Sequence, residues 1–191
     1  MPTNFTQEER NLLLQKFYKQ GDILLKTYGY KKMKVSLIAD EIGIGTGTFY
    51  HFFKSKDEYV LWLIKKRKLD AMDQFNQLAN KFPNGIPMHE LESYFFNMIT
   101  NYNIYRYLNQ EEYNHLQNKY DLLKNRDQNI EETAKYMMQK LDTTKSIESF
   151  KQFSECYTMI IIGTSDLTKL NKQYTDDAIK ALIHAACSFL Y

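Results

Sequence analysis

The sequence has few of the residues on which other fold classes depend. Two cysteines in 191 residues make no disulfide framework, so we expect a reducing, cytoplasmic location. Seven glycines and three prolines provide little turn material for a many-stranded sandwich or barrel. No apolar run approaches the roughly 20 residues of a membrane-spanning helix. The first residues also lack a basic segment followed by an apolar one, so we expect neither a membrane partner nor a secretion signal.

Hydrophobic residues are nevertheless plentiful, and charge is distributed unevenly. Hydrophobic side chains make up 43% of the chain, which is enough for a substantial core. Residues 1–70 contain 13 Lys and Arg against 8 Asp and Glu, whereas residues 71–191 contain 12 against 15. A basic first third on a mildly acidic remainder favours a polyanionic partner for the N-terminal part.

Apolar residues recur at helical spacing, and no convincing period-two alternation is present. Thr6 and Glu9 have the spacing of a capping box, which predicts a helix from about residue 7 to residue 28. Gly29 fits the left-handed position after its last turn. A short helix is predicted over 35–42, broken at Gly43.

Further helices are predicted along the rest of the chain. A short helix over 46–53 is followed by one that opens at Ser55 and ends at the breaker 82–85, and another begins near Pro87. Over 111–141 apolar positions are separated alternately by three and four residues, which predicts one continuous helix. Two more are expected over about 147–165 and 175–190, the last capped by Thr175. The predicted fold class is all-α.

The two short helices joined at Gly43 form a helix-turn-helix pattern, which presents its second helix to the DNA major groove. In that helix Phe49 and Phe53 are expected to face the core. The residues left toward solvent are small or hydrogen-bonding, as base contacts require. They are Thr46, Gly47, Thr48, Tyr50 and His51.

Many ordered positions in this region match one family. They are Gly29-Tyr30, Val35-x-x-Ile38-Ala39, and the run Gly43-Ile44-Gly45-Thr46-Gly47-Thr48-Phe49-Tyr50-His51-Phe52-Phe53-Lys54-Ser55-Lys56-Asp57-Glu58. The segment closely resembles the N-terminal domain of the TetR family of bacterial transcriptional regulators. The resemblance implies a homodimer with a variable ligand-binding domain, usually repressing a nearby gene until an effector binds.

The resemblance also implies roles for residues and domains. By position, the five outward residues fall where the family contacts double-stranded DNA, and Lys56 falls where it often holds a phosphate. Where the family usually has Thr or Ser at the start of the second helix, Lys34 and Ser36 are the phosphate-binding expectations here. We expect an N-terminal three-helix helix-turn-helix domain over 1–54 and a larger C-terminal helical domain for ligand binding and dimerisation over 55–191, with the fourth helix connecting them.

Two sites are expected in the C-terminal domain. The last two helices have more apolar surface than one packed face needs, which predicts a four-helix dimer interface. Its expected residues are Tyr157, Ile161, Leu182, Ile183, Ala186 and Leu190. Aromatic residues concentrate in the middle of the chain, where they either fill the core or line an effector pocket with one carboxylate. The expected pocket residues are Tyr94, Tyr102, Tyr113, Tyr120 and Asp127.

Other motifs have plainer interpretations. The basic run 65–68 is expected to be a solvated face, and His184 with Cys187 to be packing residues rather than metal ligands. His115 has no partner that singles it out. No nucleophile with a recognisable base and no paired carboxylates are apparent, so we expect no enzyme, cofactor or metal. The alternative is an all-α ligand-binding or carrier bundle, or an enzyme, without sequence-specific DNA binding.

Overall fold

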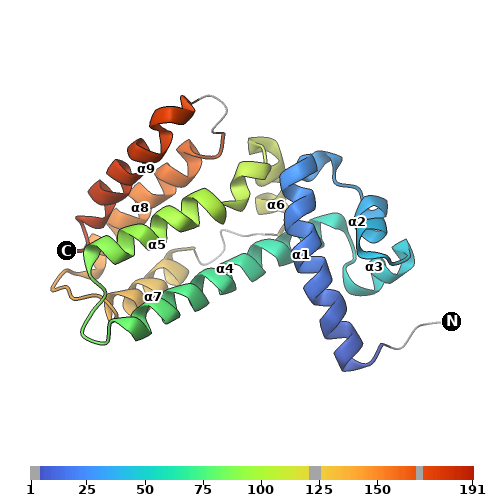
Figure 1. Cartoon of the computed structure of the whole chain (residues 1–191), viewed down its shortest axis with the longest axis horizontal. Coiled ribbons are helices and arrows are strands. Elements are labelled where there is room, and N and C mark those ends of the chain that lie inside the picture. The colour runs from blue at the N-terminus through green and yellow to red at the C-terminus, as the bar shows by residue number, and fades with distance from the viewer. Residues whose placement is uncertain (1–4, 121–125, 167–169) are drawn as a thin grey trace.

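The structure is a computed structural model that describes residues 5–120, 126–166 and 170–191. Within these ranges it contains helices and one isolated bridge, between Ile86 and Leu141, but no strand. The predicted all-α fold is therefore confirmed. The elements in chain order are α1 (Gln7–Lys32), α2 (Val35–Ile42), α3 (Thr46–Phe52), α4 (Lys56–Lys81), α5 (Met88–Asn101), the 3-10 helix η1 (Ile104–Tyr107), α6 (Gln110–Tyr120), α7 (Arg126–Met138), α8 (Ile147–Gly163) and α9 (Lys172–Cys187) (Figure 1).

Local signals place the start of the first helix and the end of the second as predicted, whereas α1 extends past its predicted end at residue 28 to Lys32. The Thr6 hydroxyl accepts a hydrogen bond from the Glu9 backbone N–H at 3.2 Å, and the Glu9 carboxylate accepts one from the Thr6 N–H at 2.8 Å. These two bonds are the predicted capping box. Gly29 has a φ of 67° inside α1, and Gly43 ends α2 with φ 77° and ψ 39°. Both glycines therefore adopt positive φ, which other residues rarely do.

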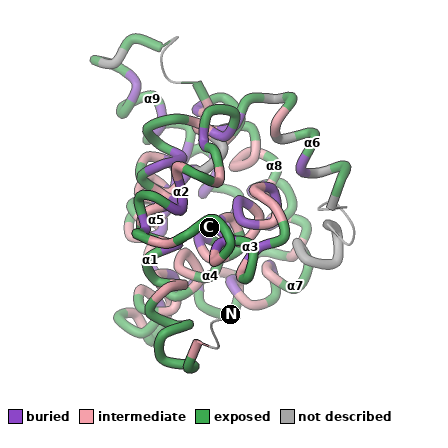
Figure 2. Tube along the Cα trace, turned by 90° about the vertical axis from the view of Figure 1, so that its right-hand side faces the viewer, coloured by how far each residue is buried: buried purple, intermediate pink, exposed green. Residues whose placement is uncertain are grey.

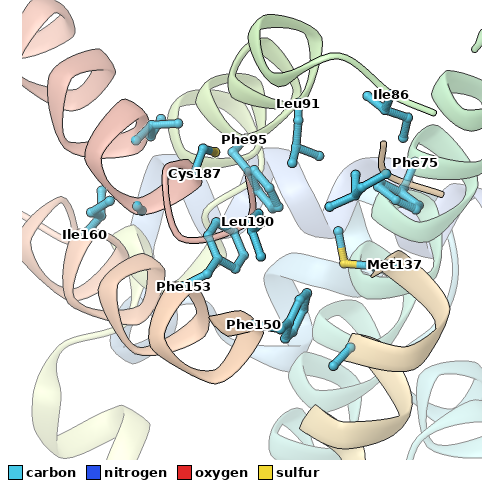
Figure 3. Close-up of a cluster of buried hydrophobic side chains, with 14 of the residues drawn as sticks. Phe75, Ile86, Leu91, Phe95, Met137, Phe150, Phe153, Ile160, Cys187 and Leu190 are labelled. Atoms are coloured by element: carbon cyan, nitrogen blue, oxygen red, sulfur yellow. The ribbon is translucent and has the colours of Figure 1, made fainter. Parts of the chain in front are cut away.

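Side chains gather in two hydrophobic clusters. The head cluster surrounds Phe17, Phe49 and Tyr59, and the body cluster surrounds Phe95 and Phe153 with further side chains from α4, α5, α7, α8 and α9 (Figure 3). Buried positions form short stretches along helices that are elsewhere half-buried or exposed (Figure 2), as amphipathic helices require.

The long helix α4 contributes to both clusters. Tyr59 and Leu63 in its first half lie in the head cluster, while Phe75 and Ala79 in its second half lie in the body cluster. The head cluster therefore extends past the domain boundary expected at residue 54. In Figure 1, α4 runs from the α2–α3 end of the molecule to the far end of the body.

The helix expected over 111–141 is described only in part. The structure has α6 and α7 in this range, and residues 121–125 between them lie outside the described part. Leu116 of α6 is buried in the head cluster, whereas Ala134 and Met137 of α7 are buried in the body cluster. Each segment packs against a different core, and the helical periodicity of its apolar residues does not reveal which.

The cap expected for the last helix is wrong. The helix begins at Lys172, because the Asn171 side chain caps it by accepting a hydrogen bond from the Gln173 N–H at 3.0 Å. Thr175 lies inside the first turn, where its buried hydroxyl donates to the Asn171 carbonyl at 2.8 Å. In the part of the chain that is described, no helix combines the length and the apolar character needed to cross a bilayer.

Candidate DNA-binding interface

Helices α2 and α3 form a helix-turn-helix whose turn is at Gly43. The Ile44 backbone N–H donates to the Ala39 carbonyl at 2.9 Å and so closes the turn against α2. Ile38 and Ala39 on the inner face of α2 are completely buried, and α2 packs against both α1 and α3. The short helix α3 is therefore held in one orientation on the head.

Aromatic rings fix the inner side of α3 against α1 and α4. The Phe53 ring, which directly follows α3, has its centroid 5.1 Å from that of Phe17 and 5.0 Å from that of Tyr59. Phe49 lies 5.6 Å from Tyr59 and is completely buried. The predicted inward orientation of Phe49 and Phe53 is confirmed. Such ring pairs add about 0.5–1.5 kcal/mol each beyond their buried area.

The opposite side of α3 faces solvent. Thr46, Gly47, Tyr50 and His51 are exposed and Thr48 is half-buried. A Cβ added at Gly47 would meet no atom within 4 Å, so the fold itself does not require glycine there. The face is thus largely exposed, and it carries hydroxyl and imidazole groups that suit base edges.

This region also matches a known family. Residues 19–61 match the model of the family described as bacterial regulatory proteins, tetR family. The N-terminal segment is therefore a DNA-binding domain of the TetR type. The matched segment contains α2, α3 and their turn, and it identifies a DNA-binding transcriptional regulator. A search of curated proteins finds no match to the chain.

The three residues expected to contact phosphates differ in how exposed their side chains are. Lys34 and Ser36 are exposed at the start of α2, and Lys34 is its N-cap without a side-chain cap bond. Lys56 is half-buried, and its Nζ donates to the Tyr30 carbonyl at 2.9 Å while lying 4.0 Å from the centroid of the Tyr30 ring. Burial lowers the pKa of Lys56, and the nearby Asp57 partly offsets this. Lys34 is therefore freer than Lys56 to reach a phosphate.

A buried carboxylate next to Lys56 joins the head to α6. The Asp57 side chain accepts hydrogen bonds from the Tyr30 hydroxyl, from His115 Nε2 at 3.0 Å and from Lys119 Nζ at 2.8 Å. Burial alone would raise the pKa of Asp57, but the bonds from Lys119, Tyr30 and His115 outweigh it and hold that pKa well below its usual value. We call these four residues the junction cluster, because they link the end of α1, the start of α4 and α6.

Arg67 links the head to the body. The sequence places it in the basic run 65–68, expected to be solvated, but Arg67 is buried, with 7% of its surface exposed. It forms an ion pair with Asp22 of α1, and its Nη1 donates to the Tyr102 carbonyl at the end of α5 at 2.8 Å. The expectation of a solvated face is therefore wrong for Arg67, since partners on two other elements compensate its burial.

The expected effector residues are only partly described. The Tyr94 hydroxyl donates to the Ala71 carbonyl at 2.9 Å, and its ring packs 5.7 Å from that of Phe75. Tyr102 is half-buried, with its ring centroid 5.7 Å from the Arg67 guanidinium. Tyr94 therefore favours the packed-core interpretation of the aromatic cluster. The side chains of Tyr113, Tyr120 and Asp127 lie outside the described ones.

Half of the expected dimer residues are buried inside the chain itself. Ile183, Ala186 and Leu190 have at most 1% of their surface exposed and belong to the body cluster, so the expectation that they contact a partner is wrong. Tyr157 and Ile161 are half-buried against the same cluster. Leu182, in contrast, is 53% exposed. The exposed apolar surface of α8 and α9 therefore includes Leu182 but not Ile183, Ala186 or Leu190.

That exposed face carries apolar residues which sequence reasoning did not select. Met159 and Ile162 of α8 are each 63% exposed, and Tyr174 of α9 is 61% exposed. Sequence reasoning also missed Asp57 and His115, which are 58 residues apart. A buried acid at the start of a helix carries no sequence signal of its distant partner, so only the tertiary structure brings the two together.

Proposed function

We propose that the protein is a homodimeric, cytoplasmic repressor that binds a palindromic operator through two copies of α3 and is released by a small effector. Thr48, Tyr50 and His51 supply sequence preference in this proposal, with Thr46 and Gly47 beside them. Lys34, Ser36 and Lys56 supply phosphate contacts, which position the protein without reading sequence.

One observation carries the proposal. The inner face of α3 is fixed by the aromatic rings of the head cluster, while Thr46, Gly47, Tyr50 and His51 on its outer face are exposed. A rigid scaffold that presents a short polar helix suits the major groove, which admits one α-helix. The positive surplus of residues 1–70 favours the same partner.

The dimer is proposed to form through the exposed apolar face of α8 and α9. Met159, Ile162 and Leu182 each have more than half of their surface exposed, on two helices that pack side by side (Figure 1). Isolated apolar residues are common on protein surfaces, but several such residues on two neighbouring helices favour an interface. Two such pairs would form a four-helix interface with two-fold symmetry.

The effector is proposed to act through the links between the body and the head. The junction cluster and Arg67 both connect head elements to α5 or α6. An effector that shifts these helices would change the separation of the two α3 helices in the dimer. The coupling is reciprocal, so operator DNA changes effector affinity by the same factor.

The test is a gel-shift and fluorescence-anisotropy assay with fragments of the source genome, including those flanking the gene. We expect saturable binding to a palindromic site. Tyr50→Ala and His51→Ala should each weaken that site by about 1–3 kcal/mol while leaving non-specific binding unchanged. The matched control is Tyr28→Ala, because Tyr28 is also an exposed tyrosine but lies on α1.

Phosphate contacts are tested by their salt dependence. Lys34→Ala should weaken all sequences about equally and reduce the salt slope by about one unit. Lys145→Ala, at an exposed lysine of the body, should leave the slope unchanged. A protein that binds no fragment above its non-specific affinity would favour the ligand-binding or carrier bundle instead.

A further inference from the structure

A groove of about 520 Å³ lies between α1 and α4. Its apolar lining includes Leu14 from α1 and Trp62 and Leu69 from α4, and none of its lining residues belongs to α3. The volume falls within the roughly 300–1,000 Å³ of small-molecule sites. The groove is thus separate from the outer face of α3 and from the apolar face of α8 and α9.

The indole of Trp62 is a rigid part of this groove. Its ring centroid lies 5.2 Å from that of Phe53 and 6.1 Å from that of Tyr59, both in the head cluster. On the groove side the Tyr18 ring meets it edge-on at 6.3 Å. The apolar surface offered to a ligand is therefore held in place before binding, which lowers the ordering cost of association.

The polar rim of the groove favours an anion. Lys65 is exposed and Lys66 half-buried, and neither forms an ion pair with a carboxylate of the described residues. The one carboxylate in the lining, Asp70, already accepts a hydrogen bond from the Tyr18 hydroxyl. Two ammonium groups thus face a single carboxylate that has a partner, and a charged oxygen ligand would gain strong hydrogen bonds from them.

We propose that this groove binds an amphipathic organic anion, with its carboxylate at Lys65 and Lys66 and its apolar body against Trp62, Leu14 and Leu69. The class includes medium-chain fatty carboxylates and arylalkanoates. This goes beyond the proposed function, because the groove is walled by α1 and α4 rather than by the aromatic residues of the body. It needs neither DNA nor a second copy of the chain.

The test uses the DNA-free full chain and decanoate as the probe, at concentrations below its micellar range. Trp62 is the only tryptophan, so its emission reports on the groove and not on the α8–α9 face. We expect a saturable change in emission with decanoate. Decanol and decylamine should bind at least about ten-fold more weakly, because neither supplies an anion. An equal response to all three, or no saturable response to decanoate, would overturn the proposal.

Variants locate the anion contact. The double substitution Lys65→Gln/Lys66→Gln should weaken decanoate binding about ten-fold, whereas Lys68→Gln, at an exposed lysine on the same helix that does not line the groove, should leave it unchanged. If the double variant keeps full decanoate affinity and instead loses non-specific DNA affinity, these lysines belong to a DNA-contacting surface and the proposal is wrong. Equal losses in both variants would also refute it.

Discussion

Gly21 lies where α1 packs closely against Tyr59 and Leu63 of α4. A Cβ placed there would come within 2.1 Å of the Tyr59 hydroxyl and 2.9 Å of the Leu63 side chain. Tyr59 is completely buried and its hydroxyl donates to the Phe17 carbonyl at 2.7 Å, so it has no free direction in which to move. The absence of one methyl group thus sets the distance between the two helices.

Gly21→Ala is expected to destabilise the protein despite the higher helix propensity of alanine. Overpacking of a dense core costs about 1–3 kcal/mol, which exceeds the propensity gain of about 1 kcal/mol. Thermal and urea unfolding measure the change. A variant as stable as wild type would mean that α1 and α4 separate easily, contrary to the packing of the head cluster.

Gly47→Ala, in contrast, is expected to raise the stability of the protein and to lower its operator affinity. A methyl group at Gly47 meets no atom within 4 Å, so the variant should gain up to about 1 kcal/mol of stability from helix propensity. If α3 lies in the major groove, the same methyl group narrows the approach to DNA and lowers operator affinity. Unfolding and anisotropy measured on one preparation separate the two effects. Unchanged operator affinity would mean that Gly47 does not lie in the DNA interface.

At the scale of elements, the junction cluster connects α1, α4 and α6 through one carboxylate. Asp57→Asn would keep the shape of the side chain but remove the negative charge that accepts the hydrogen bonds of His115 and Lys119. We expect a loss of about 1–3 kcal/mol in the free energy of unfolding. The matched control is Asp176→Asn, at an exposed aspartate of α9, which should stay close to wild type.

The same cluster predicts a pH dependence with a definite sign. Hydrogen bonds hold the pKa of Asp57 below its usual value in the folded protein, so the stabilisation is fully present above the unfolded pKa of about 4. It is lost as the pH falls below that value toward the folded pKa. The stability difference between wild type and Asp57→Asn should therefore shrink below about pH 4. A difference that stays constant as the pH falls to 2.5 would contradict the hydrogen-bonded carboxylate.

At the scale of the whole molecule, replacing an exposed apolar residue of α8 or α9 by Glu should affect dimerisation, whereas replacing a buried one should affect folding. Leu182→Glu is expected to give a folded monomer with lower operator affinity, because Leu182 is 53% exposed on the proposed interface. Leu12→Glu is the matched control, since Leu12 is equally exposed but lies on α1. Ile183→Glu should unfold the body instead, since Ile183 belongs to the body cluster.

Sedimentation and circular dichroism distinguish these outcomes. A Leu182→Glu variant that remains dimeric with native helicity would show that the dimer interface lies elsewhere on the protein. Dissociation in Leu12→Glu as well would mean that the effect is not specific to α8 and α9.

The sequence by itself determined the features that depend on neighbours along the chain. The capping box at Thr6, the positive φ at Gly43 and the inward faces of Phe49 and Phe53 all follow from backbone geometry over a few residues. The same local information identified the family, because the turn and its flanking helices lie within one continuous segment. The outer face of α3 was predictable for this reason.

Only the tertiary structure decided features that depend on distant partners. Helical periodicity marks the apolar positions of 111–141 but does not show that Leu116 of α6 enters the head cluster while Met137 of α7 enters the body cluster. Nor does it show which apolar positions of α9 pack inward, and it therefore placed the buried Ile183 at the surface together with the exposed Leu182. Arg67 and Asp57 are buried because Asp22, Tyr102, His115 and Lys119 reach them from elsewhere in the chain. A charge is stable inside a protein only with such partners, and chain distance gives no sign of them.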